Sequence, residues 1–292
     1  MAALTLKTAI LSLACFIVGL YFAALLALCL WQDRLIFPAP ATFPAATPAA
    51  AGLPFEDLHI PVDNATQLHA WWIPAETPSS KVILYFHGNG YSLESEATAE
   101  APLFHQAGAD LLLADYRGYG TSSPAHTNGP STEADARAAM RYLIQHRRIP
   151  ASSVVIAGWS IGSAVAAELA VESPHAAGLV LLSPIASTAE VANQNWVFRY
   201  LFRPVEWFGH RNDFDTKARI STVHIPVLIV SGTQDELAPP WMAESIYGRA
   251  NEPKLIRLID GAHHNDLLEP RDGSLLRVLR TFLEHPAPLS ND

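Results

Sequence analysis

A serine flanked by glycines stands where a buried strand is expected to end. The segment Gly158-Trp-Ser-Ile-Gly162 follows the apolar run Val154–Ala157 and opens an alanine-rich run of helical character. A serine on such a tight turn has a strained backbone, and flanking glycines avoid collisions with the neighbouring chain. The turn lifts the hydroxyl above the sheet, beside the positive end of a helix. The pattern alone is weak, but this context predicts that Ser160 is a nucleophile.

A serine nucleophile needs a base, and the base needs an acid that orients it. Asp235 lies just past the expected end of a late strand, and His264 follows the next apolar segment. Acid and histidine therefore come after the serine in the order expected for this turn. The adjacent His263 stays open as an alternative base. We prefer His264, and predict that Ser160 attacks, His264 relays the proton and Asp235 orients the imidazole.

Acyl transfer also needs two backbone amides that stabilise an oxyanion. One is expected from Ile161, the residue after the nucleophile. The other is expected from the loop His87-Gly-Asn-Gly90, which follows the apolar run Val82–Phe86. Its glycines allow the chain to turn so that the amide of Asn89 points into the site. For His87 itself we expect a hydrogen bond that braces this loop.

Composition argues against several other chemistries. Both cysteines, Cys15 and Cys29, lie in the first apolar segment, so the rest of the chain has neither a catalytic thiol nor a disulfide. The 12 histidines form no His-Glu-x-x-His motif, and the adjacent His263 and His264 are poorly disposed to share one ion. We therefore expect no metal and no cofactor. A formal net charge of −9 argues against nucleic acid as a partner.

Short, continuous apolar runs alternate with helical segments through most of the chain. Such runs are typical of strands buried on both faces of a mostly parallel sheet, with helices on each side. The expected strands are Val82–Phe86, Leu111–Ala114, Val154–Ala157, Leu179–Leu182 and Val227–Val230, and the expected helices are Glu94–Gln106, Thr132–Arg147, Ile161–Glu172 and Trp241–Gly248. Glu56–Pro61 and Leu68–Pro74 predict an antiparallel edge hairpin. An insertion at about 185–222 breaks the alternation and is interpreted as a small lid.

The first apolar segment, Ala9–Trp31, contains no charged residue. As a helix it would be about 34 Å long, enough to span a hydrocarbon layer of ~30 Å. A cleaved signal peptide is the alternative, but its apolar region is usually shorter and precedes small residues. We predict an uncleaved signal anchor over 1–34, a Pro/Ala-rich spacer over 35–54 and a catalytic domain over 55–285. The slight charge bias, with Lys7 before the segment and Arg34 after it, favours a single-pass topology with the domain on the non-cytoplasmic side.

Five motifs together resemble one known family. They are His87-Gly-Asn-Gly, Asp115-Tyr-Arg-Gly-Tyr-Gly120, Gly158-Trp-Ser-Ile-Gly-Ser163, Gly232-Thr-Gln-Asp235 and His264-Asn-Asp266. In this order they resemble membrane-anchored α/β-hydrolase-domain proteins, a family that includes animal lysophospholipases and protein depalmitoylases. The similarity runs from about Leu35 to Phe282. It implies the α/β-hydrolase fold, a triad of Ser160, Asp235 and His264, and oxyanion amides from Asn89 and Ile161.

Family members attack esters and thioesters of long acyl chains, which draws attention to the aromatic residues of the lid. Our hypothesis is that Trp196 and Phe202 belong to an acyl-binding wall that faces the membrane. The alternative is a cap helix that buries these aromatic side chains on the domain.

The leading functional prediction is a serine hydrolase that cleaves carboxylic esters or thioesters, with a small-molecule or lipid ester as substrate and a membrane as partner. A serine aminopeptidase and a catalytically silent binding module on the same scaffold are the alternatives.

Overall fold

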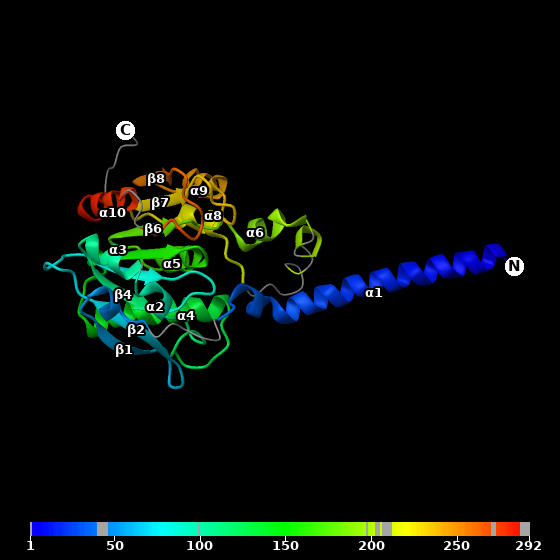
Figure 1. Ribbon diagram of the computed structural model, residues 1–292, viewed down its shortest axis with the longest axis horizontal. Helices are drawn as coiled ribbons and strands as arrows, with labels where there is room; N and C mark the ends of the chain where they lie inside the picture. Colours follow the sequence, from blue (N-terminus) through cyan, green and yellow to red (C-terminus); the bar gives the residue numbers. More distant parts are fainter. Residues whose placement is uncertain are drawn as a thin grey trace.

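The computed structural model describes residues 2–39, 46–98, 100–196, 198–201, 205, 212–269 and 273–286. Its centre is an 8-stranded sheet in the order β1-β2-β4-β3-β5-β6-β7-β8 (Figure 1). The strands are β1 (Glu56–Pro61), β2 (Gln67–Ile73), β3 (Val82–Phe86), β4 (Asp110–Ala114), β5 (Val154–Trp159), β6 (Gly178–Leu182), β7 (Val227–Gly232) and β8 (Lys254–Ile259). Strands β3 to β8 are parallel, and β1 and β2 form the expected antiparallel hairpin at one edge. The prediction of an α/β-hydrolase fold with a mostly parallel sheet is confirmed.

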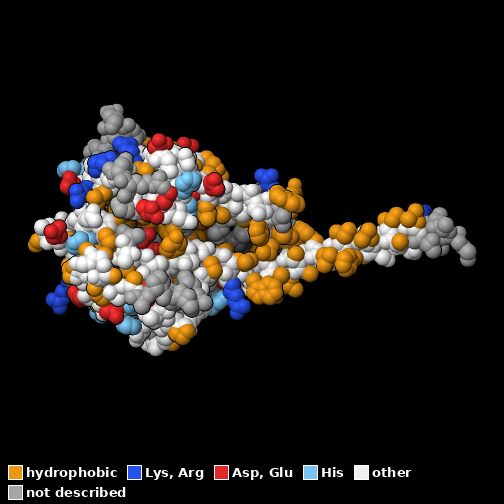
Figure 2. Space-filling view, viewed as in Figure 1, with side chains coloured by type: hydrophobic (Ala, Val, Ile, Leu, Met, Phe, Trp, Pro, Cys, Tyr) orange, Lys and Arg blue, Asp and Glu red, His pale blue; other side chains and the backbone are white. Residues whose placement is uncertain are grey.

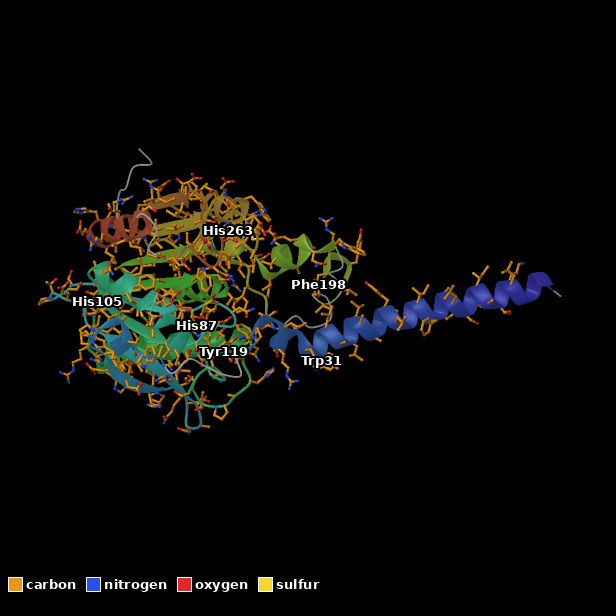
Figure 3. The ribbon with its side chains drawn as sticks, in the orientation of Figure 1. Trp31, His87, His105, Tyr119, Phe198 and His263 are labelled. Carbon is orange, nitrogen blue, oxygen red and sulfur yellow. The ribbon has the colours of Figure 1, made fainter. Side chains whose placement is uncertain are left out.

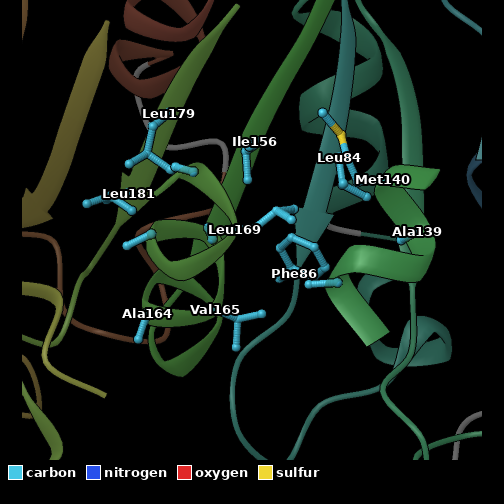
Figure 4. Close-up of a cluster of buried hydrophobic side chains, with 14 of the residues drawn as sticks. Leu84, Phe86, Ala139, Met140, Ile156, Ala164, Val165, Leu169, Leu179 and Leu181 are labelled. Atoms are coloured by element: carbon cyan, nitrogen blue, oxygen red, sulfur yellow. The ribbon is translucent and has the colours of Figure 1, made fainter. Parts of the chain in front are cut away.

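Helices cover both faces of the sheet. They are α2 (Leu93–Glu96), α3 (Glu100–Gln106), α4 (Gly129–Arg141), α5 (Ile161–Val171), α8 (Thr216–Arg219), α9 (Pro240–Tyr247) and α10 (Ser274–Glu284), whereas α6 (Thr188–Gln194) lies beside the sheet domain, toward α1 (Figure 1). Side chains alternate across each buried strand, so Leu84 and Phe86 pack under α4 and α5, while Ile83 and Tyr85 pack under α3 and α10. Figure 4 shows the first of these two cores. Two apolar layers thus hold the strand ends in fixed positions.

Two helices differ from their expected bounds for local reasons. The segment expected as one helix, Glu94–Gln106, is divided into α2 and α3. Pro102 lies in the first turn of α3, where a helix tolerates a residue without an amide hydrogen. Helix α4 begins three residues before the expected Thr132, because Asn128 and Ser131 form a capping box with reciprocal hydrogen bonds of 3.0 and 2.8 Å.

The N-terminal helix α1 (Ala2–Ile36) extends away from the sheet domain (Figure 1). An 18-residue stretch within Leu6–Ile36 has a mean hydropathy of 2.6, and this helix is long and apolar enough to cross a membrane. Hydrophobic side chains cover most of its projecting length (Figure 2). Its last turn is different, because Gln32 and Asp33 are buried against the domain, as is Phe37 just beyond it. The end of α1 is therefore packed into the fold.

Candidate active site

The structure places Ser160 on the turn between β5 and α5. Its backbone has φ 56° and ψ −122°, a left-handed conformation that costs free energy for a residue with a Cβ. The Ser160 amide donates to the carbonyl of Leu182 at 3.0 Å, and the hydroxyl of Ser163 donates to the Ser160 carbonyl at 2.5 Å. These bonds hold the strained turn from both sides and direct the Ser160 side chain away from the sheet.

The glycines on either side of Ser160 are required by close backbone packing. A Cβ on Gly158 would overlap the carbonyl oxygen of Gly162, and a Cβ on Gly162 would overlap the carbonyl oxygen of Phe86. Both obstacles are backbone atoms in the centre of the fold, so they cannot rotate away as a flexible side chain can. The tight passage of α5 past the end of β3 thus explains the Gly-x-Ser-x-Gly spacing.

Ser160, His264 and Asp235 form a continuous chain of hydrogen bonds. The distance from the Ser160 hydroxyl to His264 Nε2 is 2.9 Å, and His264 Nδ1 lies 2.8 Å from Asp235 Oδ2. Asp235 is 3% exposed, and its other oxygen accepts the amides of Leu237 and Ala238 at 3.0 and 2.7 Å. Because a carboxylate only accepts hydrogen bonds, the imidazole proton sits on Nδ1 and leaves Nε2 as the acceptor for the serine. This arrangement suits general-base activation of Ser160.

The two adjacent histidines lie in different environments. His264 is buried against the indole of Trp159, with ring centroids 5.3 Å apart, whereas His263 is exposed. The backbone amide of His263 donates to Asp266 Oδ1 at 2.6 Å, which closes the turn that aims His264 inward. Figure 3 shows His263 on the domain surface. The structure therefore brings His264, and not His263, to the serine.

The loop after β3 lies beside the nucleophile. Gly88 is so close to Trp159 that a Cβ would meet its ring at 2.6 Å, and Asn89 shares one cavity with Ser160. Ile161 is the first residue of α5, where a backbone amide has no acceptor within the helix. Asn89 and Ile161 thus line the same cavity as Ser160.

His87 supports this loop from behind. Its Nδ1 donates to the carbonyl of Gly88 at 2.8 Å, its Nε2 lies 3.3 Å from Asp115 Oδ1, and its own carbonyl accepts the Tyr116 hydroxyl at 3.1 Å. The ring also packs on Tyr119, at 5.3 Å between centroids, and Figure 3 shows the two residues side by side. His87 is 1% exposed. It has the bracing contacts that the sequence predicts.

A pair of buried carboxyl groups lies near this loop, on α2 and α3. Burial raises the pKa of Glu100 to about 7, and burial with the neighbouring charge of Glu100 raises the pKa of Glu96 well above its ordinary value. Glu96 is fully buried and Glu100 is 7% exposed. Burial therefore keeps both carboxyl groups neutral to a higher pH than they would be in water.

One group of described side chains has the composition of a metal site. Ligand atoms of His69, Glu94 and Asp115 all lie within 4.8 Å of one another. His69 Nε2 lies 2.6 Å from Asp57, an arrangement that orients an imidazole. None of these residues lines the cavity that contains Ser160. A cation there would brace the fold behind the His87 loop rather than touch a substrate.

The cavity next to Ser160 has a volume of about 570 Å³, within the range of small-molecule sites. Its lining comes from five parts of the chain: Leu28, Gln32, Leu35 and Ile36 of α1; Asn89 and Tyr91; Trp159, Ser160 and Ile161; Ile185, Thr188, Val191, Ala192, Phe198 and Val205 of the lid region; and Leu237, His264 and Asn265. Among these described residues no aspartate, glutamate, lysine or arginine is present. The cavity is therefore a mostly apolar chamber that contains the Ser160–His264 pair.

The lid differs in detail from the hypothesis. Trp196 is 76% exposed and does not line the cavity, whereas Phe198, two residues later, does. Phe202 lies outside the described residues. The cavity residues of α1 were not among the predicted site residues, although Leu28, Gln32 and Leu35 recur with helical spacing. Their polar member, Gln32, was the available signal that this face of the helix does not meet lipid.

The fold and the site define the class of protein as an α/β hydrolase. Residues 81–209 match the family model described as alpha/beta hydrolase fold. An uncharacterised protein of Mycobacterium tuberculosis is 34% identical over 265 residues, which cover 88% of this chain and 89% of that one. Human alpha/beta hydrolase domain-containing protein 17B is 31% identical over 208 residues, which cover 71% of this chain and 68% of that one. The chain belongs to the α/β-hydrolase family.

Solved structures agree on the fold. The Pyrococcus furiosus esterase Pf2001 aligns with a TM-score of 0.69 at 19% identity, over 84% of this chain and 96% of the esterase. Est1E of Butyrivibrio proteoclasticus, solved with ferulic acid, aligns with a TM-score of 0.62 at 20% identity, over 78% of this chain and 98% of that one. At these identities the similarity shows the fold alone. The substrate class has to be inferred from the residues of the site.

Proposed function

We propose that the protein is a serine hydrolase that cleaves carboxylic ester or thioester bonds, acts on acyl or lipid-like substrates, and is held at a membrane by α1 with its catalytic domain on the non-cytoplasmic side. The observation that carries the proposal is the hydrogen-bond chain Asp235–His264–Ser160, which ends in an apolar cavity. A nucleophile with a base, beside a chamber without charged walls, suits the carbonyl of an apolar acyl group.

The chemistry follows from the positions of these groups. The Ser160 oxygen attacks the carbonyl carbon while its proton passes to His264 Nε2, and the backbone amides of Asn89 and Ile161 stabilise the resulting oxyanion. Collapse breaks the bond to the alcohol or thiol, which leaves with the proton from His264. Water then attacks the acyl-serine, gives one proton to His264 and releases the carboxylic acid, and the serine recovers its proton. Asp235 stabilises the imidazolium in both halves.

The cavity favours this reading over an aminopeptidase. Recognition of a substrate amine needs an anionic side chain, and among the described cavity residues there is none. The resemblance to membrane-anchored members of the family supports an acyl substrate and a membrane location.

A fluorophosphonate probe tests the nucleophile, because it reacts covalently with activated serines. We expect the full-length protein to be labelled, the Ser160→Ala variant to lose the label, and the Ser245→Ala variant to keep it, since the Ser245 hydroxyl donates to the carbonyl of Met242 within α9. A silent binding module would not be labelled at all. A panel of acyl esters and thioesters of graded chain length then tests the substrate class, and absence of Ser160-dependent turnover across the panel would refute the proposal.

A further inference from the structure

The end of the N-terminal helix forms one wall of the active-site cavity. Leu28, Gln32, Leu35 and Ile36 all line the chamber that contains Ser160. Their spacing puts them on one face of α1, because residues four and seven apart lie above one another on a helix. A helix that served only as a tether would present no face to the substrate-binding site. The last turns of α1 are therefore built into the site.

A buried polar clamp holds this face of α1 in place. Asp33 is 1% exposed, and its two oxygens lie 2.7 Å from Asn212 Nδ2 and 2.6 Å from His126 Nε2. The side-chain oxygen of Asn212 accepts the amide of Gly129, the first residue of α4, at 2.7 Å. Phe37, just beyond the helix, packs edge-on against Phe214 at 6.0 Å. These contacts fix the direction in which α1 leaves the domain.

The lid region lies against the apolar length of the same helix. The Tyr21 hydroxyl donates to the carbonyl of Tyr200 at 3.0 Å, and Leu25, one turn further along α1, is buried. Tyr21 precedes Gln32 by about 16 Å of helix at 1.5 Å per residue. Phe198, beside Tyr200, lines the cavity, and Figure 3 shows it above α1 with Trp31 below. Lid and helix thus enclose the outer end of the chamber between them.

The surface around this end is apolar. Leu26, Leu30 and Trp31 of α1 are 60, 63 and 54% exposed, and Tyr200 of the lid region is 67% exposed. Figure 2 shows hydrophobic side chains along the helix and on the lid beside it. A continuous apolar surface of this kind marks contact with a membrane or a partner. Helix α1 is long and apolar enough to span a bilayer. Because the lid lies against the apolar length of α1, a bilayer that α1 crosses would bring its near leaflet into contact with the lid.

We infer that α1 is a wall of the acyl-binding site, and that the acyl chain of a bilayer-resident ester or thioester reaches Ser160 sideways from the near leaflet, between α1 and the lid. The inference rests on the proposed hydrolase function and extends it by naming the route. A chain that passes along this route stays in apolar surroundings from the leaflet to the serine, so it crosses no water layer. The membrane helix then contributes to chain-length selectivity as well as to location.

The test is a change of selectivity in the full-length protein reconstituted into phosphatidylcholine vesicles. Leu28→Trp adds bulk on the cavity face, and Leu30→Trp adds the same bulk on the opposite, lipid-facing side. The readout is the ratio of kcat/KM for a hexadecanoyl ester to that for a butyryl ester. We expect Leu28→Trp to lower this ratio at least tenfold and Leu30→Trp to leave it within twofold. If the hexadecanoyl-to-butyryl ratio of kcat/KM were the same in Leu28→Trp as in Leu30→Trp, the inference would be overturned.

Two further measurements keep the outcomes separable. Fluorophosphonate labelling of Leu28→Trp shows whether the site is still assembled, and labelling together with an unchanged ratio counts against the route. A hexadecanoyl ester with a diazirine in its chain, photolysed in vesicles with Ser160→Ala, should label peptides that contain Leu28–Ile36. Label that falls only on peptides distant from α1 and the lid would contradict the inference even if Leu28→Trp failed to fold. Loss of all Ser160-dependent turnover in the unmodified protein would instead refute the proposed function.

Discussion

The substitution Asp235→Asn tests the catalytic geometry with almost no change of shape. Asp235 Oδ1 accepts two backbone amides, those of Leu237 and Ala238, and Oδ2 faces His264 Nδ1. An asparagine can accept those two amides only with its own oxygen, so its NH₂ group must face the histidine. The imidazole then has to accept at Nδ1 and carry its proton on Nε2. In that tautomer it cannot take the proton of Ser160.

The magnitude follows from the hydrogen bonds that hold the amide in this orientation. Turning the asparagine over would leave both backbone amides facing an NH₂ group, and each buried donor left without an acceptor costs about 1–3 kcal/mol. Two such losses cost ~2–6 kcal/mol, which corresponds to roughly 30-fold to 10⁴-fold in rate at about 1.4 kcal/mol per tenfold. A neutral amide also stabilises the imidazolium less than a carboxylate does. We therefore expect kcat/KM to fall by roughly 10²–10⁴.

The assay is kcat/KM for a short-chain p-nitrophenyl ester, together with the rate of fluorophosphonate labelling and the melting temperature. Both rates should fall together, while the melting temperature stays close to that of the unmodified protein, because the substituted side chain keeps hydrogen-bond partners for both its oxygen and its nitrogen. A variant that folds normally and retains more than a tenth of the activity would refute this account of Asp235.

Three further predictions follow from the same structure. Gly162→Ala places a Cβ against backbone carbonyls and should lower the melting temperature by several degrees or prevent folding, whereas Gly248→Ala, whose Cβ meets nothing closer than 3.5 Å, should change stability by less than about 1 kcal/mol. The pKa of Glu100 is about 7 in the folded protein against an ordinary 4.5, so the unfolded chain loses this proton at lower pH and the group destabilises the fold progressively as pH rises from 4.5 to 7. In denaturant titrations, the free energy of unfolding of Glu100→Gln should therefore rise relative to that of the unmodified protein over this pH range. A difference between the two proteins that does not change with pH would contradict the assignment. His264→Ala should lose at least 10³-fold in ester hydrolysis and His263→Ala only a few-fold, and the reverse ranking would reverse their roles.

Much of the candidate site is readable from local sequence, because each part follows a buried strand. In a parallel sheet the carboxyl ends of all strands meet at one edge, so residues placed just after β3, β5, β7 and β8 come together without further information. Apolar runs identify those strands, and chain order assigns serine, acid and histidine. The choice between His263 and His264 is different in kind. It depends on which side chain the turn closed by Asp266 aims inward.

The lid and the end of α1 were the parts that sequence reasoning described least well. Periodicity marks Ala9–Trp31 as an apolar helix but carries no information about what its last turns touch. The contact between Asp33 and Asn212 joins residues 179 positions apart, and no local sequence pattern at either residue predicts it. Local sequence also gave no guide to Trp196, an aromatic residue that we predicted to belong to the acyl-binding wall and that is solvent-exposed in the structure.

The α/β architecture, the strained serine turn and the chain order of nucleophile, acid and histidine follow from local sequence, because they depend on apolar periodicity and on where strands end. Three features required the folded structure: which histidine faces Ser160, that Phe198 rather than Trp196 lines the cavity, and that α1 closes one side of it. Those features arise where segments distant in the chain pack together. Packing of that kind is set by shape and hydrogen-bond complementarity across the whole fold, which a single segment does not encode.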